Sequence, residues 1–374
     1  MNSFPPTRIL MTTDAVGGVW TYSTTLASAL ADAGLEICLV IVGPAPQGGK
    51  RAVLRDPRIQ VIESGLALEW QDPQGDDLPN ARAFFADLEE RLLPDVVHLN
   101  SFREATFDWM APVLVVAHSC VNSWALACND KEWLSEPRWQ HYTQAVATAL
   151  SSAQGWVTPS AAFHEVVRNL YRPNSPGAVI WNGITPAAIE AKSNRQIILA
   201  AGRMWDAAKN ISLLARAANG LDWPVLVAGP TLDAPWSNAG ALTLIGELPY
   251  GDLRLRMQHA AIFVSPALYE PFGLSVLEAA AARCALVLSD IPTFRELWDG
   301  AALFVDPVDA GALHVALASL CADDRERARL QSAARERSQR YGLPHTVEAY
   351  RSLYQNLMAS HSASVLPRGT EVHA

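Results

Sequence analysis

The feature that most constrains the fold is a plan of alternating apolar runs and helical segments, which occurs twice in the chain. The first copy begins at residue 8 with RILMTTDAVGGVWTYSTTLASALADAGLEICLVIV, and the second begins at residue 196 with QIILAAGRMWDAAKNISLLARAANGLDWPVLVAGP. Each copy predicts a strand, a loop, a helix and a second strand, with Gly34 and Gly220 near the helix ends. Strands that alternate with helices in this way form parallel sheets covered on both faces.

The remaining apolar runs extend this plan through both halves. We expect strands at 95–100, 112–118 and 155–160 in the first half, and at 224–228, 242–246, 261–266, 284–289 and 302–307 in the second. A chain of 374 residues is longer than one hydrophobic core usually supports. The sequence therefore predicts an α/β protein with two doubly wound Rossmann-like domains that face each other across a cleft. The periodicity lapses near 184–195, so the first domain is expected over 1–185 and the second over 194–344.

Charge and composition narrow the class of protein. The formal net charge is −9, which disfavours non-specific binding to nucleic acid or to anionic lipid. The five cysteines are scattered and odd in number, which is typical of reduced thiols. The sequence has no apolar stretch typical of a signal peptide or a membrane span, so we expect a cytoplasmic protein, for which peripheral membrane contact stays open.

The stretch ALYEPFGLSVLEAAAARC, residues 267–284, predicts an anion site. Phe272 and Gly273 lead into a helical run, so the free amides of the first turn lie around Gly273, Leu274 and Ser275. Glu278 follows about one turn later, roughly 5 to 6 Å along the helix axis. That is about the separation between the phosphates of a nucleotide and its ribose hydroxyls.

The two carboxylates of this stretch also allow an ordinary structural interpretation. Glu278 can face solvent from one helix edge, and Glu270 can be a turn residue. If Glu278 is instead buried among its apolar neighbours, an unpaired carboxylate costs several kcal/mol, and ligand hydroxyls are suitable partners. Glu270, just before the helix, would then reach past the phosphates toward the sugar that they carry.

The segments GRMWDAAKN and EPFGLSVLE, together with VVAHS and VIWNGI in the first half, resemble family 4 glycosyltransferases, which are retaining enzymes of the GT-B fold. The resemblance covers roughly residues 8–358. It implies that Arg203 and Lys209 bind the diphosphate, and that His118 contacts the donor sugar. The Arg203 to Lys209 spacing is one residue longer than the commonest family pattern. With these cations present, the resemblance implies no metal and no further cofactor.

The same resemblance implies how the two domains, the last helix and the tail are arranged. The first domain binds the acceptor, the second binds the nucleotide sugar, a helix over 345–360 crosses back to the first domain, and 361–374 is a mobile tail. Gly17 and Gly18 fit a loop that brings the backbone close to the phosphates or the acceptor, although glycine pairs also mark ordinary turns.

Several further positions have structural or alternative roles. His98 is either an acceptor contact or a structural residue, and we favour the second. Asn182 and Gly183 are expected to be structural residues at the domain junction. Asp290 is either a specificity residue or a helix cap. Arg283 stands where the family more often has glycine, and the sequence offers no explanation for it.

The function implied is transfer of a hexose-type sugar, with retention, from a UDP- or GDP-sugar to a hydroxyl of a glycan, lipid-linked or small-molecule acceptor. The segment DAVGGVW lacks the glycine pattern of a nicotinamide enzyme. Three alternatives stay open: a nucleotide-sugar 2-epimerase of the same fold, a phosphorylase, and a catalytically silent nucleotide-sugar-binding subunit. A phosphorylase is disfavoured because no lysine stands out as a pyridoxal anchor.

Overall fold

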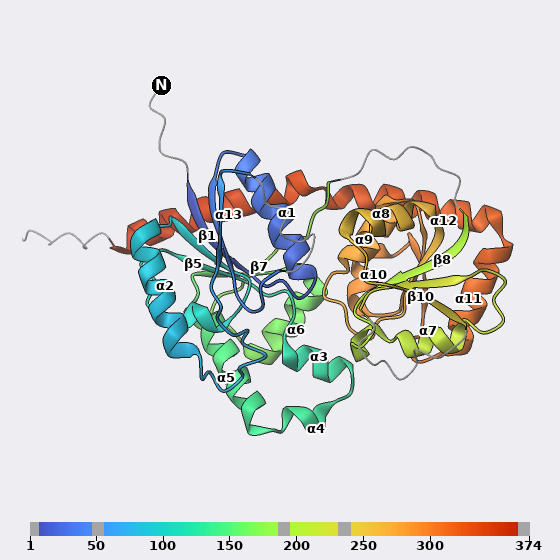
Figure 1. Ribbon diagram of the computed structural model, residues 1–374, viewed down its shortest axis with the longest axis horizontal. Helices are drawn as coiled ribbons and strands as arrows, with labels where there is room; N and C mark the ends of the chain where they lie inside the picture. The colour runs from blue at the N-terminus through green and yellow to red at the C-terminus, as the bar shows by residue number, and fades with distance from the viewer. Residues whose placement is uncertain (1–6, 47–55, 186–194, 231–240, 366–374) are drawn as a thin grey trace, which may run out of the picture.

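The computed structural model describes residues 7–46, 56–185, 195–230 and 241–365. Within these residues the chain forms two lobes, each built on a parallel sheet with helices on both faces (Figure 1). The predicted α/β class and the pair of doubly wound Rossmann-like units are therefore confirmed. The linker expected near 184–195 lies mostly outside the described residues.

The first lobe contains a sheet with the strand order β3-β2-β1-β4-β5-β6-β7. Strand β1 lies between β2 and β4, and it pairs in parallel with β2 from Arg8↔Glu36 to Thr13↔Ile41. The elements, with η marking a short 3-10 helix, are β1 (Arg8–Thr13), α1 (Gly18–Asp32), β2 (Glu36–Ile41), β3 (Ile59–Glu63), α2 (Leu78–Leu92), β4 (Val96–Leu99), η2 (Arg103–Thr106), β5 (Val113–Val116), α3 (Val121–Ala127), α4 (Lys131–Leu134), α5 (Pro137–Ser152), β6 (Gly155–Thr158), α6 (Ala161–Tyr171) and β7 (Ala178–Val179).

The second lobe repeats this plan with the strand order β10-β9-β8-β11-β12-β13. Its inner strands β11 and β12 are buried along nearly their whole lengths, as apolar runs in a parallel sheet should be. The elements are β8 (Arg195–Ala201), η3 (Ala207–Lys209), α7 (Ile211–Ala217), β9 (Val225–Ala228), β10 (Leu242–Gly246), α8 (Tyr250–His259), β11 (Ala260–Ser265), α9 (Leu274–Ala281), β12 (Ala285–Ser289), α10 (Pro292–Trp298), β13 (Ala302–Val305), α11 (Ala310–Ala322), α12 (Asp324–Ser338) and η4 (Gln339–Tyr341).

The last helix, α13 (Leu343–Val365), runs from the second lobe along the first (Figure 1). Its Tyr350, Tyr354 and Leu357 are buried in the core that covers one face of the first sheet. The tail predicted over 361–374 is wrong for residues 361–365, because the helix continues through them. Ser362 supports this continuation, since its hydroxyl donates to the carbonyl of Met358 at 2.9 Å.

The start of α13 is packed tightly against the end of the first lobe. The amide of Ile184 donates to the carbonyl of Tyr341 at 3.1 Å, and the amide of Leu343 donates back to Ile184 at 3.0 Å. A Cβ on Gly183 would lie 2.4 Å from Oγ1 of Thr346 and 2.7 Å from Cα of Leu343. A glycine is thus required here by close approach, which agrees with the structural role expected of Gly183.

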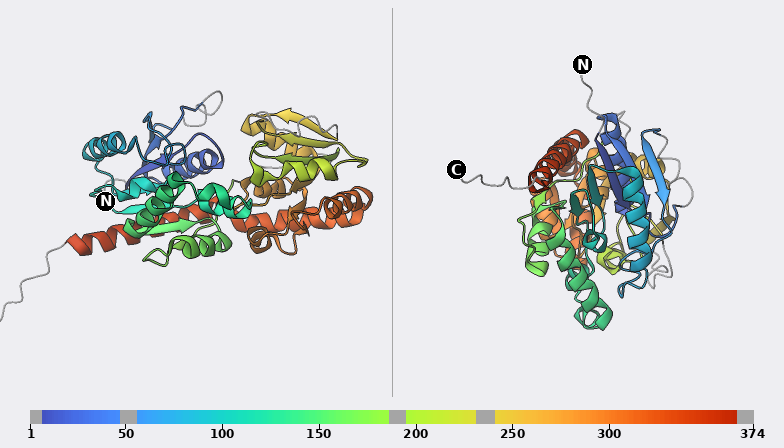
Figure 2. Two further views of the ribbon diagram at one scale, coloured as in Figure 1. Left: turned by 90° about the horizontal axis from the view of Figure 1, so that it is seen from below. Right: turned by 90° about the vertical axis from the view of Figure 1, so that its left-hand side faces the viewer.

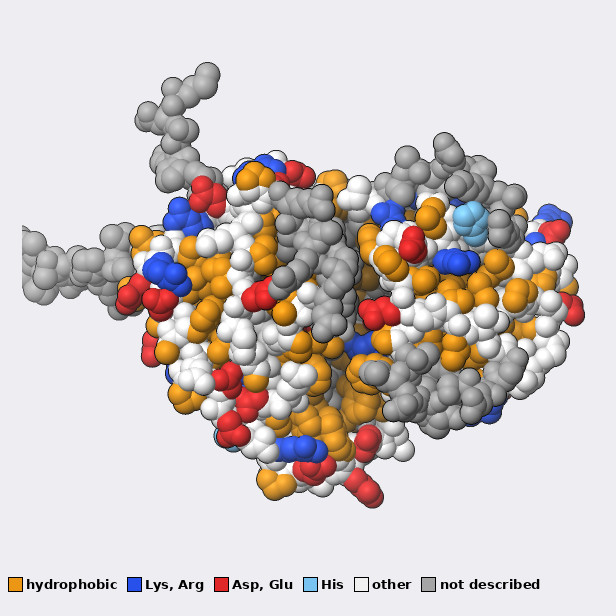
Figure 3. Space-filling view, viewed as in Figure 1, with side chains coloured by type: hydrophobic (Ala, Val, Ile, Leu, Met, Phe, Trp, Pro, Cys, Tyr) orange, Lys and Arg blue, Asp and Glu red, His pale blue; other side chains and the backbone are white. Residues whose placement is uncertain are grey.

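The two sheets lie in separate lobes (Figure 2), and the surface is hollowed between the lobes on the face seen in Figure 3. The lobes also touch directly. The hydroxyl of Ser160, the N-cap of α6, donates to the carbonyl of Pro271 at 2.6 Å. The carboxylate of Glu296 accepts from the amides of Ala161 and Ala162 at 2.9 and 2.7 Å, so a side chain of the second lobe caps a helix of the first.

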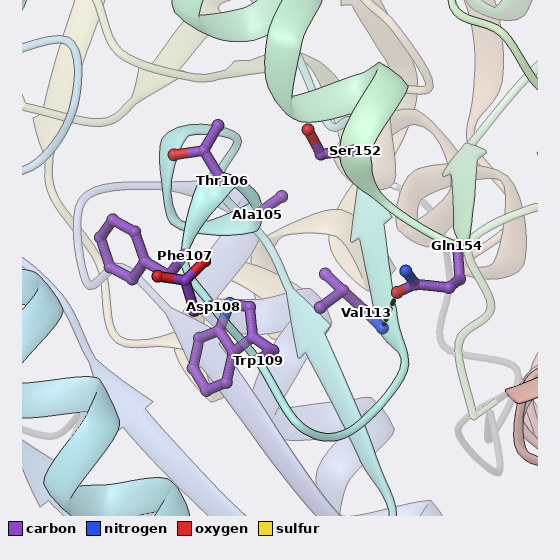
Figure 4. Close-up of a pocket in the computed structure, with 8 residues that line it drawn as sticks. All are labelled: Ala105, Thr106, Phe107, Asp108, Trp109, Val113, Ser152 and Gln154. Carbon is purple, nitrogen blue, oxygen red and sulfur yellow. Dashed lines mark hydrogen bonds between the residues drawn. The ribbon is translucent and has the colours of Figure 1, made fainter. Parts of the chain in front are cut away.

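Away from this hollow, a shallow pocket of about 240 Å³ opens on the first lobe (Figure 4). Its lining includes Phe107, Trp109, Val113 and Gln154, and the Gln154 side chain accepts from the Val113 amide at 2.7 Å. Val113 begins β5, so the pocket lies at the amino ends of the strands, opposite the edge at which the predicted site residues lie. In the part of the chain that the structure describes, no helix is long and apolar enough to cross a membrane.

Candidate active site

The amino end of α9 forms the centre of the candidate site. Gly273 is the N-cap and has a φ of 90°, a left-handed conformation that favours glycine. The first bonds of the helix run from the amides of Val276 and Leu277 to the carbonyl of Gly273. The amides of Leu274 and Ser275 therefore have no carbonyl partner within the helix, and both residues are partly open to solvent. This geometry suits an anion.

Glu270 and Lys209 lie beside this helix end as an ion pair. Nζ of Lys209 donates to Oε2 of Glu270 at 2.6 Å, and both side chains are mostly buried. A Cβ on Gly273 would lie 3.3 Å from Cγ of Glu270, so the carboxylate lies directly against the N-cap. The loop before Glu270 is held across the lobes by Tyr269, whose hydroxyl is 2.7 Å from that of Ser123.

Arg203 is joined to both lobes through Asp206. Nη2 of Arg203 donates to Asp206 at 2.7 Å, and Nε1 of Trp124, from the first lobe, donates to the other oxygen at 2.9 Å. Burial alone would raise the pKa of Asp206, but the bonds from Arg203 and Trp124 and the nearby charge of Lys209 hold it below its usual value. Among the described residues, the buried Nε of Arg203 has no hydrogen-bond partner.

The glycine pair of the first lobe faces this arginine. Gly17 is the N-cap of α1, and a Cβ on it would lie 2.8 Å from Nη1 of Arg203. The backbone of Gly17 is extended, with a φ of −168°, so close approach explains this glycine and backbone strain does not. A Cβ on Gly18 would meet nothing within 4 Å. The two glycines therefore have different surroundings, although the sequence analysis expected the same role for both.

Glu278 is buried, with only 8% of its surface exposed, so it does not face solvent. Burial raises the pKa of its carboxyl to about 7, and the Tyr250 hydroxyl and the Arg254 charge only partly oppose this shift. Both of these partners come from α8, which packs beside α9. A buried carboxylate of this kind is consistent with an acceptor for ligand hydroxyls.

His118 follows β5 at the carboxyl edge of the first sheet, and it is partly open to solvent. Its Nε2 is 2.7 Å from Oδ1 of Asn100, and the ring of Tyr22 packs edge-on with centroids 4.4 Å apart. Burial, with a smaller effect from His98, lowers the pKa of His118 to about 3, so the imidazole is neutral at physiological pH.

Three other expectations have clear outcomes. The side chain of Phe272 is buried in the core against Tyr341, so only its backbone can reach a ligand. His98 has no exposed surface and is 2.6 Å from the hydroxyl of Tyr354, which agrees with a structural role. Asp290 forms a two-bond ion pair with Arg295 at 2.6 and 2.7 Å and does not cap a helix.

The structure also explains Arg283. Its φ of 67° is left-handed, and it directly follows the last residues of α9. The amide of Arg283 donates to the carbonyl of Ala280, and that of Cys284 donates to Ala279, both at 3.0 Å. This is a helix C-terminus of the kind that glycine usually occupies.

Four residues of the site were missed by the sequence analysis: Asp206, Asn100, Tyr22 and Tyr250. One feature of the sequence indicated Asp206. It lies between Arg203 and Lys209, whose spacing is one residue longer than the commonest family pattern. Its side chain caps η3 by accepting from the amide of Ala208 at 3.0 Å. Within the described ranges, no group of three or more His, Cys, Asp or Glu side chains could hold a metal ion. That the enzyme needs no metal stays a prediction.

Two family models match the chain, one over each lobe. Residues 16–188 match the family described as Glycosyltransferase Family 4, and residues 184–337 match Glycosyl transferases group 1. Glycogen synthase from Mycobacterium tuberculosis is 25% identical over 369 aligned residues, which cover 86% of each chain. Against three further curated relatives of 27–38% identity, the chain spans 10%, 40% and 28% of their lengths.

Solved structures share the fold. Sucrose-phosphate synthase from Thermosynechococcus elongatus superposes with a TM-score of 0.78 at 20% identity, over 95% of this chain and 100% of that one. The Anabaena protein HepE, in a complex with UDP and glucose, superposes with a TM-score of 0.75 at 15% identity, over 94% and 100%. The predicted resemblance is thus confirmed, and this chain belongs to the family 4 glycosyltransferases of the GT-B fold.

Proposed function

We propose that this enzyme transfers a hexose-type sugar from a UDP- or GDP-sugar to a hydroxyl of an acceptor, with retention of the anomeric configuration. The observation that carries the proposal is the convergence of Arg203, Lys209 and Glu270 with the amino end of α9, closed from the other lobe by Gly17. That HepE is described in a complex with UDP and glucose supports a nucleotide-sugar donor.

The difficult step is departure of the anionic nucleotide diphosphate while the sugar develops positive charge. In the ligand-free protein Arg203 is paired with Asp206, and Lys209 is paired with Glu270, so the charges of these side chains balance. The diphosphate is then held by donors that these pairs leave free. They are the amides of Leu274 and Ser275, and the Arg203 side chain, which is 39% exposed although its Nε is buried.

The carboxylates have different tasks in this proposal. Glu278, about one helical turn from the phosphate site, accepts from the ribose hydroxyls. Glu270 holds hydroxyls of the transferred sugar, and its bond of 2.6 Å to Lys209 favours a holding role over nucleophilic attack. The acceptor hydroxyl then approaches on the face that the diphosphate leaves, and a phosphate oxygen takes its proton. Configuration is retained without an enzymic nucleophile.

The acceptor is expected to be a glycan, a lipid-linked sugar or a small-molecule glycoside, bound against the first lobe. A 2-epimerase would convert the donor without any acceptor, and a silent subunit would bind the donor without converting it. Both alternatives therefore predict that no sugar is transferred to any acceptor.

The test is binding followed by turnover. Isothermal titration with UDP, GDP, UDP-glucose and GDP-mannose identifies the nucleotide, and release of nucleotide with a mixture of acceptors measures transfer. Arg203→Ala and Glu270→Ala should each reduce transfer at least a hundredfold, because the first removes a contact that stabilises the departing diphosphate and the second removes the hydrogen bonds that hold the sugar. Exposed Arg216→Ala, away from the site, is the matched control. If both site variants kept activity within a fewfold of wild type, the assignment would be wrong.

A further inference from the structure

A buried polar network lies directly behind His118, and Asn100 is its centre. Asn100 follows β4, and its Oδ1 is 2.7 Å from Nε2 of His118 and 3.3 Å from Nε2 of His98. No described residue forms a hydrogen bond with Nδ1 of His118. One amide oxygen thus faces two imidazoles, and the proton positions on both rings follow from its orientation.

The orientation of the Asn100 amide is fixed by its other contacts. Its Nδ2 donates to the main-chain carbonyl of Thr12 at 2.6 Å and to the hydroxyl of Ser23 at 3.2 Å. Its main-chain amide donates to Oγ1 of Thr12 at 2.8 Å. A flipped amide would bring its oxygen against the Thr12 carbonyl oxygen, where neither group can donate. Oδ1 therefore points at the imidazoles and can only accept.

The protons on the two rings follow. Nε2 of His118 must carry a hydrogen, because it donates to Oδ1 of Asn100. Nε2 of His98 also faces this oxygen, so it carries a hydrogen too. The second ring nitrogen of His98, Nδ1, lies 2.6 Å from the hydroxyl of Tyr354 on α13 and accepts from it. Within the part of the chain that the structure describes, the second ring nitrogen of His118 has no such partner. It is a hydrogen-bond acceptor on a residue that is partly open to solvent.

We infer that Asn100 is a positioning residue that fixes His118 as the Nε2-protonated tautomer, so that Nδ1 accepts a hydrogen bond from the bound ligand. This inference rests on the proposed function for its ligand, a donor sugar, and it adds a specificity rule. The sugar group that meets His118 must be a donor such as a hydroxyl, because a carboxylate or carbonyl there would face a lone pair.

The surroundings keep His118 in this state. The groups packed around it and its partner are Tyr22 from α1, His98 and Asn100 at β4, and Tyr350 and Tyr354 from α13. Burial raises the pKa values of all three tyrosines, so none is an anion at physiological pH. None of these described groups would therefore supply a counter-charge to a second proton on His118.

The most direct test is the nitrogen spectrum of the histidines in the ligand-free protein. Long-range proton–nitrogen correlation of the ¹⁵N-histidine-labelled enzyme separates protonated from unprotonated ring nitrogens, and the signal lost in His118→Gln identifies His118. We expect a protonated Nε2 and an unprotonated Nδ1 from pH 8 to pH 5. A spectrum with Nδ1 protonated in the wild type would overturn the inference, and this measurement does not depend on catalysis.

A substitution tests the causal part. In Asn100→Ala the acceptor for Nε2 of His118 is lost, so neither ring nitrogen of His118 is selected as the protonated one. Its nitrogen signals should then report a mixture of both neutral tautomers. Affinity for UDP-glucose or GDP-mannose, whichever binds the wild type more tightly, should fall about threefold, because only part of the population presents an acceptor to the sugar.

Tyr354→Phe is the matched control, since it breaks a bond of the same buried network without touching Asn100 or His118. It should lower stability but leave the His118 signals and the donor affinity unchanged. If Asn100→Ala and Tyr354→Phe gave the same spectra and the same donor affinity, Asn100 would be a structural residue only. If the tautomer is as inferred but neither donor binds, the proposed function fails while the positioning role stands.

Discussion

The burial of Glu278 leads to a prediction that links stability to binding. In the folded protein the pKa of this carboxyl is raised to about 7 from an ordinary value of 4.5, chiefly by desolvation. Stability from this group is therefore fully present below pH 4.5 and is lost as the pH rises to about 7. At 1.36 kcal/mol per pH unit, the ionised carboxylate costs the ligand-free fold about 3 kcal/mol above pH 7.

The variant Glu278→Gln keeps the shape of the side chain and removes its charge. In urea unfolding of the ligand-free protein, we expect the variant to be more stable than wild type by about 3 kcal/mol at pH 8 and by less than about 1 kcal/mol at pH 5. Exposed Glu90→Gln, which also removes one negative charge, is the matched control. An equal gain at both pH values would refute the idea that Glu278 is ionised and buried.

The same variant should bind nucleotide less well. A carboxylate accepts from two ribose hydroxyls, whereas the amide of glutamine presents one oxygen and one NH₂ group. Affinity for UDP or GDP at pH 8 should fall about tenfold, measured by isothermal titration. A variant that gained stability and kept its affinity would mean that the carboxylate is buried for a reason other than nucleotide binding.

Other substitutions test separate contacts. Gly17→Ala places a methyl group 2.8 Å from Nη1 of Arg203 and should lower UDP or GDP affinity about tenfold, whereas Gly18→Ala, in open space, should not change the titration. Trp124→Phe removes an inter-lobe bond to a buried carboxylate, worth about 2 kcal/mol, and should enlarge the ligand-free protein in small-angle scattering; unchanged curves would contradict this. Arg283→Gly relieves a left-handed φ of 67° and should raise stability to urea by up to about 1 kcal/mol; a loss would show that the side chain compensates for its backbone.

Much of the fold could be predicted because its strands are buried on both faces. Such strands form continuous apolar runs, as in β5 and β12, and these runs are visible in the sequence. Strand β3 was not predicted, because it lies at a sheet edge and most of its residues are at least partly exposed. The end of α13 was placed too early, because small polar residues such as Ser362 are compatible with both helix and tail.

The candidate site was predictable only where function requires a particular residue type. The glycine and carboxylates around α9 follow from anion and hydroxyl binding, so their spacing carries a signal. Asn100 and Asp206 carry little signal of their own, because their partners are distant in the sequence. Asn100 meets Thr12 across 88 positions, and Asp206 meets Trp124 across 82. Such contacts depend on how the strand ends and lobes are brought together, which periodicity does not reveal.

The central claim is that a nucleotide diphosphate binds at the amino end of α9. The most direct measurement is a crystal structure of the enzyme with UDP or GDP. The account predicts phosphate oxygens within hydrogen-bond distance of the amides of Leu274 and Ser275 and of the Arg203 side chain, with the ribose hydroxyls on Glu278. A nucleotide bound elsewhere, with this helix end contacting only solvent, would contradict it.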